Sequence, residues 1–160
     1  MQEEVASERG RSQRVWSPEL FRRIVVPVDF TEPTRRAFLE ALSLSRLCDG
    51  AVHLMSLVLP GECDEFIAGV GGGAWRPGDY LDEANAGLRR FVDHVAPEEA
   101  ERCQYHVAIG DDIVRNVLEV IDRVDATLVL IGADTATGIF RSPVERIARR
   151  APCSVLLLAA

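Results

Sequence analysis

Short runs of β-branched and aliphatic residues alternate along the chain with segments whose apolar residues recur at helical spacing. The runs cover residues 24–28, 51–59, 103–109, 127–131 and 153–158. The first, Ile24 to Val28, is wholly apolar, as a strand buried on both faces should be. Runs of this kind separated by helices are typical of βα units on a parallel sheet. We therefore predict an α/β fold with a single open parallel five-stranded sheet and helices on both faces.

Four segments between or beside these runs have helical spacing. They lie near residues 37–45, 81–95, 113–121 and 143–150. The last has the strongest start, because Ser142 to Glu145 reads S-P-V-E, a capping box with Pro at the first helical position. Asp111 and Asp112 precede the third segment, where the helix dipole favours acidic groups. We interpret this pair as a helix start rather than as two acids for general acid–base catalysis.

The length of 160 residues fits one domain of ordinary size. Residues 1–20 have little periodicity, so we expect a flexible N-terminal extension followed by one domain over 21–160. The stretch from Pro60 to Asp79, with its run of glycines, predicts a long and flexible connection. No apolar run approaches the roughly 20 residues that span a bilayer, and no signal-peptide core is present. We expect a cytoplasmic protein without a membrane partner.

Charge and composition exclude several classes of function. The net charge of −7 leaves no general basic field for nucleic acid, and the arginines of the N-terminal segment are interpreted as a solvated tail. All 18 basic residues are Arg, which excludes a Schiff-base lysine and the lysine of a P-loop. Enzymes that need either lysine are therefore excluded.

The cysteines and histidines give no sign of a metal site or a catalytic triad. Their positions are Cys48, Cys63, Cys103, Cys153, His53, His94 and His106. The cysteines form no C-x-x-C pair and are interpreted as reduced packing residues. The histidines lack metal-ligand spacing and are interpreted as ordinary surface or strand residues. We predict no metal site.

Polar residues follow two of the predicted strands at their carboxyl ends. Asp29-Phe30-Thr31 ends the first strand, and a polar loop from Gly132 to Ser142 follows the fourth. In an open parallel sheet, ligands bind at the carboxyl ends of the strands, where helix N-termini gather. If the two strands are neighbours, these segments form one candidate ligand site.

The sequence resembles the universal stress protein family from about Arg23 to Leu158. The resemblance rests on the opening strand 24–31, on Gly110-Asp111-Asp112, on the segment 125–132 and on the segment 144–158, in this order and spacing. It implies a fold of the adenine nucleotide alpha hydrolase-like, universal stress protein type. It also implies a homodimer through the C-terminal strand Cys153 to Leu158, because in that family the last strand commonly pairs with its copy across a two-fold axis. An uncovered apolar edge strand is an aggregation hazard, which supports the same expectation.

Many members of the resembled family bind ATP through a G-x-x-G-x9-G-[ST] pattern, whose glycines let backbone N–H groups approach the phosphates. Gly132 matches the first glycine, but Thr135 stands at the second and Arg141 replaces the glycine before Ser142. The intervening loop is also shorter. Asp134 adds a negative charge where the phosphates would lie. The phosphate part of the pattern is therefore degenerate.

The resemblance assigns a role to each remaining residue of the site. Asp29 and Thr31 would contact the nucleoside and the Leu57 backbone the base, while Gly132, Thr135 and Ser142 would contact phosphates, with Arg141 as a compensating phosphate ligand. Each has a structural alternative: Asp29 can accept loop N–H bonds, Thr31 can cap a helix, and the Ser142 hydroxyl can be used in its capping box.

We therefore expect a regulatory or interaction module of the universal stress protein kind, not an enzyme, with unknown protein partners, no cofactor and no tight binding of ATP. One alternative is an ATP-binding switch or slow ATPase that holds Mg-ATP with a rearranged loop. A second alternative is another nucleotide-binding flavodoxin-like fold, which shares the strand pattern.

Overall fold

The computed structural model describes residues 17–59, 77–133 and 143–159. The helices are η1 (Pro18–Phe21), α1 (Glu32–Ser45), η2 (Arg46–Cys48), α3 (Pro77–Val95), η3 (Pro97–Arg102), α4 (Ile113–Val124) and α5 (Pro143–Arg150), where η denotes a 3-10 helix. The strands are β1 (Arg23–Val28), β2 (Ala51–Val58), β3 (Cys103–Ile109), β4 (Leu128–Ala133) and β5 (Ser154–Ala159). All five predicted strands and all four predicted α-helices are present within a few residues of their expected bounds. The helix η1 begins inside the segment expected to be a flexible extension, residues 1–20, and ends one residue beyond it.

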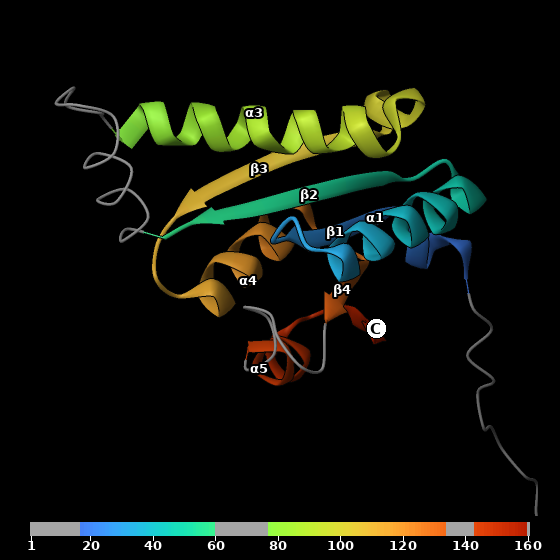
Figure 1. Ribbon diagram of the computed structural model, residues 1–160. Helices are drawn as coiled ribbons and strands as arrows, with labels where there is room; N and C mark the ends of the chain where they lie inside the picture. The colour runs from blue at the N-terminus through green and yellow to red at the C-terminus, as the bar shows by residue number, and fades with distance from the viewer. Residues whose placement is uncertain (1–16, 60–76, 134–142, 160) are drawn as a thin grey trace, which may run out of the picture.

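The five strands form one sheet in the order β3-β2-β1-β4-β5, and every pair is parallel. Helices α1 and α3 cover one face, and α4 and α5 cover the other (Figure 1). The predicted architecture is therefore confirmed. Strand order reverses between β1 and β4, because the chain crosses from β3 at one edge back over β2 and β1 to reach β4.

The two faces of the sheet bury two apolar clusters. Alternate residues of β1 divide between them: Ile24 and Val26 pack under α1 and α3 with Phe38 and Leu88, whereas Val25 packs under α4 and α5. Alternation of this kind follows from the two-residue period of a strand. Both faces of the central strands are thus buried, which explains why the strand segments are almost continuously apolar.

Local sequence signals set the ends of the helices that flank the site. The side chain of Asp112 accepts a hydrogen bond from the backbone N–H of Arg115 at 3.1 Å, so the predicted helix start is confirmed. This bond lowers the pKa of Asp112, and Arg146 and Arg150 of α5 act in the same direction. Helix α5 begins at Pro143, the position that the capping-box pattern predicts.

Candidate functional site

Three of the predicted site residues, Asp29, Leu57 and Gly132, lie where neighbouring strands have their carboxyl ends. We call this side of the sheet its carboxyl edge. Val28 at the end of β1 is level with Ser56 of β2, which places Asp29 beside Leu57. On the other side Ile24 is level with Leu128, and the same offset places Val28 beside Gly132. The carboxyl ends of β1, β2 and β4 thus meet at the point where strand order reverses, which is where ligands bind in open α/β sheets.

Asp29 is held by the first turn of α1. Its Oδ1 atom accepts hydrogen bonds from the backbone N–H of Thr31 at 3.1 Å, from the Thr31 hydroxyl at 2.6 Å and from the hydroxyl of Thr34, which is buried. The expectation that Asp29 accepts loop N–H bonds is confirmed. Thr31 occupies the N-cap position of α1 but makes no side-chain cap hydrogen bond. The three bonds all end on one oxygen, so the carboxylate is oriented while Oδ2 lies outside them.

Gly132 is required by packing between β4 and α1. A Cβ atom at this position would lie 2.1 Å from the carbonyl oxygen of Pro33 and 2.8 Å from the backbone nitrogen of Thr34. Both are backbone atoms that cannot move away without shifting the helix, so any side chain is excluded. The close approach explains Gly132 without reference to a phosphate.

Leu57 contributes its backbone to this edge. Its side chain is half-buried and packs against the cluster under α4, together with Val25 and Met55. The contact between the main chain of Leu57 and a ligand, which the resemblance implies, stays a prediction. Thr135, Arg141 and Ser142, together with Asp134, lie outside the described residues.

Phe30 is a feature of this edge that the sequence interpretation missed. It lies between Asp29 and Thr31 with a φ of 61°, in the left-handed region, and 52% of its surface is exposed. Its ring makes an edge contact with Phe91 of α3, with 5.9 Å between ring centroids and an interplanar angle of 80°. The signal was present in the sequence as an aromatic residue directly after the first strand.

His53 and His106 form a second arrangement that spacing alone did not reveal. Their ring nitrogens, Nδ1 of His53 and Nε2 of His106, lie 3.0 Å apart across β2 and β3. Burial lowers the pKa of His53 to about 4, and burial also lowers the pKa of His106. Among the described residues, no group of three or more His, Cys, Asp or Glu side chains is gathered as a metal site would require.

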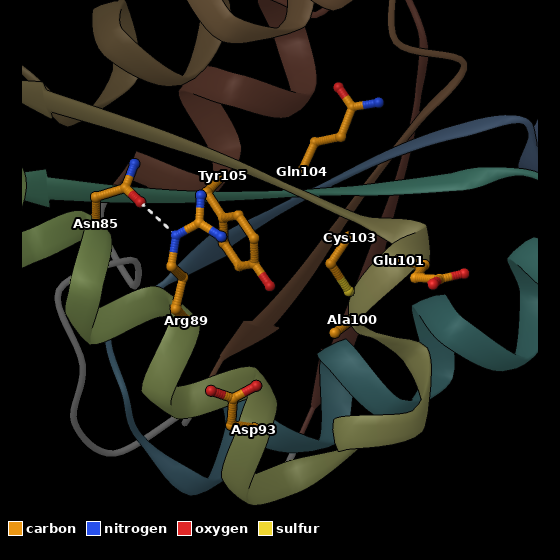
Figure 2. Close-up of a pocket in the computed structure, with 8 residues that line it drawn as sticks. All are labelled: Asn85, Arg89, Asp93, Ala100, Glu101, Cys103, Gln104 and Tyr105. Atoms are coloured by element: carbon orange, nitrogen blue, oxygen red, sulfur yellow. Dashed lines mark hydrogen bonds between the residues drawn. The ribbon is translucent and has the colours of Figure 1, made fainter.

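A shallow pocket of about 520 Å³ lies at the other end of β3 from this edge. Figure 2 shows Arg89 of α3 lying across Tyr105 of β3, with the guanidinium 4.7 Å from the ring centroid and a hydrogen bond of 3.1 Å from its Nε to Asn85. Arg89 and Tyr105 thus interact with each other across the pocket. The pocket lies near the amino end of β3, whereas ligands of open α/β sheets bind at the carboxyl ends of the strands. We therefore place the candidate ligand site at the carboxyl ends of β1, β2 and β4.

Among the described residues, Cys48, Cys103 and Cys153 are free thiols, of which Cys103 is buried and the other two are half-buried. Cys63 lies outside the described residues. Burial raises the pKa of Cys103 to about 12, so its reactive thiolate form is suppressed at neutral pH. Over the described ranges, the helices are too short or too polar to cross a membrane.

The fold defines the class of protein. It is a doubly wound α/β protein, with a candidate ligand site at the carboxyl ends of β1 and β4, where strand order reverses. Residues 20–159 match the sequence model of the Universal stress protein family. The chain belongs to this family, and the resemblance found in the sequence is confirmed. No curated protein sequence matches it.

Solved structures of universal stress proteins share the fold. One from Burkholderia pseudomallei is 19% identical, with a TM-score of 0.61 and coverage of 88% of this chain and 98% of that chain. A universal stress protein solved in complex with cAMP is 21% identical, with a TM-score of 0.61 and coverage of 86% and 96%. One from Archaeoglobus fulgidus in complex with dAMP is 22% identical, with a TM-score of 0.60 and coverage of 86% and 98%.

Proposed function

We propose that this chain is a dimeric regulatory module whose switch-point site takes an adenine nucleoside or its monophosphate and does not bind ATP tightly. The observation that carries the proposal is the oriented carboxylate of Asp29, fixed by Thr31 and Thr34 at the carboxyl end of β1. A carboxylate held in this way is a ready acceptor for sugar hydroxyl or base N–H groups, because its orientation costs nothing further on binding.

The degenerate phosphate loop argues against tight binding of a triphosphate. Two of the three glycines that admit phosphates to backbone N–H groups are replaced, by Thr135 and Arg141, and both carry side chains that obstruct such an approach. Asp134 adds a carboxylate, and like charges about 4 Å apart repel by about 1 kcal/mol in water and more when partly buried. Each additional phosphate of a ligand therefore adds repulsion without the usual donors.

Two structural neighbours support a monophosphate as ligand. They were solved in complex with cAMP and with dAMP, each of which carries a single phosphate. Their identity to this chain is low, so they support the kind of ligand and not the contacts that would hold it.

Calorimetric titration of the purified protein with AMP, cAMP and Mg-ATP tests the proposal. We expect AMP or cAMP to bind at least as tightly as Mg-ATP, and Asp29→Asn to weaken binding of both monophosphates. A variant carrying Asp134→Gly, Thr135→Gly and Arg141→Gly should gain affinity for Mg-ATP selectively. Micromolar binding of Mg-ATP by the natural protein, tighter than AMP, would instead establish the ATP-binding switch. Absence of binding by all three ligands would leave a module that acts through protein partners alone.

The exposed edge of β5 supports the homodimer. β5 spans Ser154–Ala159, one residue further along the chain than expected, and among the described strands it pairs only with β4. Leu156 and Leu157 point to opposite faces and are 38% and 47% exposed. An apolar edge strand of this kind is stabilised by pairing with a second copy about a two-fold axis.

A further inference from the structure

Phe30 combines a strained backbone with an exposed aromatic side chain. A bulky residue is disfavoured in the left-handed region, which glycine adopts freely. More than half of the residue is also exposed to water, so much of the stabilisation available from burying an aromatic side chain is not realised. Strained backbone of this kind is concentrated at functional sites.

The ring is nevertheless held in place. Phe91 contacts Phe30 on one side and the fully buried Phe38 on the other, with 5.5 Å between the centroids of Phe38 and Phe91. The tip of the Phe30 ring lies above Gly87 of α3, where an added Cβ would come within 3.8 Å of it. Three aromatic rings thus form a row from the core to the surface, and Phe30 is its exposed end.

The exposed end of this row lies at the candidate site. Phe30 is flanked in sequence by Asp29 and Thr31, whose hydrogen bonds to each other fix the loop on either side of it. Val28 is level with Ser56, so the next residues along the two strands, Asp29 and Leu57, follow at the same carboxyl ends. A planar ligand group that reaches this edge would meet an apolar ring already ordered by Phe91.

We propose that Phe30 is a base-binding residue, whose ring packs against the base of the bound nucleoside. The inference rests on the proposed function and names the group that would hold the base. An aromatic side chain that stacks on a base typically contributes enough that its removal weakens binding by about 5-fold to 100-fold. Because Phe30 and Phe91 meet edge to face, a face of the Phe30 ring stays available to pack against a base.

The substitution Phe30→Gly separates this role from a structural one. Glycine relieves the backbone strain while removing the ring, so the variant should unfold at the same or a higher urea concentration than the natural protein if strain dominates. We expect its affinity for AMP, measured by calorimetry, to fall at least about 5-fold. Phe30→Tyr, which keeps the ring, should retain affinity. Leu47→Ala is the matched control, because Leu47 is 65% exposed in η2, which precedes the amino end of β2.

The outcomes distinguish the inference from the proposed function. Loss of AMP affinity in Phe30→Gly, with a folded protein and an unchanged Leu47→Ala control, supports both. AMP binding that is unaffected by Phe30→Gly overturns the role of Phe30 and leaves the proposed function standing. Absence of AMP binding by the natural protein overturns both. A loss of affinity that Phe30→Tyr shares with Phe30→Gly contradicts stacking, because the ring is then not the group that matters.

Discussion

At the scale of single residues, His53 and His106 place two titratable rings in contact on neighbouring strands of the sheet. His53 is only 5% exposed, and the hydrogen bond between the rings needs one nitrogen without a proton. The guanidinium groups of Arg23 and Arg123 also disfavour a positive charge, the first at His53 and the second at His106. The folded protein therefore favours the neutral form of both imidazole rings.

Acid should therefore destabilise the protein through this pair. The pKa of His53 is about 4 in the folded protein against an ordinary value of 6.5, so the unfolded chain binds more protons between these values. The associated stability is fully present above pH 6.5 and is lost as pH falls toward 4, and the difference corresponds to on the order of 3 kcal/mol. Lowering of the pKa of His106 acts in the same direction.

Urea unfolding at pH 7.5, 6.5, 5.5 and 4.5 measures this dependence. We expect the free energy of unfolding to fall less steeply with acid in His53→Gln than in the natural protein. His94→Gln is the control, since His94 is exposed on α3. Parallel pH profiles for the natural protein and His53→Gln would contradict the assignment.

Elements were easier to predict than the contacts between them. Strand and helix periodicity depends on neighbouring residues, so β1 to β5 and the four α-helices follow from the sequence. The 3-10 helices η1, η2 and η3 were missed because segments of three to six residues show no period. The pairing of His53 with His106 and the contact of Gly132 with Pro33 depend on strand order and on how closely a helix approaches, which residue spacing does not encode.

Two of the missed elements, η2 and η3, are joined by charged side chains. Glu99 of η3 accepts hydrogen bonds from Arg46 of η2 and from Arg102. Arg102 in turn donates to Asp49 at 3.0 Å and to the carbonyl oxygen of Gly50 at 2.9 Å. The hydrogen bond from Arg46 is the main cause that lowers the pKa of Glu99. This network fixes the chain where it enters β2 and β3.

Removal of the negative charge of Glu99 should destabilise the hydrogen-bond network that joins η2 and η3. The side chain of Glu99 is 14% exposed, so its hydrogen bonds to charged partners are only partly screened by water. We expect Glu99→Gln to lower the free energy of unfolding at pH 7 by about 1–3 kcal/mol. The neighbouring Glu98 is exposed, and Glu98→Gln should change the free energy of unfolding by no more than about 0.5 kcal/mol. Equal effects of the two substitutions would show that the network contributes little.

At the scale of the whole molecule, β5 is an edge strand that pairs with β4. In the proposed dimer, Leu157 of each copy lies at the interface, whereas in a monomer it stays in contact with water. We expect the natural protein to sediment with twice the mass of one chain and Leu157→Glu to shift it to the mass of a single chain. Leu47→Glu adds the same charge at another exposed leucine and should leave the mass unchanged. A natural protein that sediments as a monomer at all concentrations would contradict the dimer.

The close approach of Gly132 to Pro33 bears on how chains of this kind are classified from sequence. A chain with this contact keeps glycine at that position whether or not it binds a nucleotide, because the helix backbone excludes every other residue. A motif search that scores this glycine as part of a phosphate-binding signature would therefore overcount nucleotide-binding chains. The later glycines of the signature, which this chain replaces with Thr135 and Arg141, are the positions that should carry the weight.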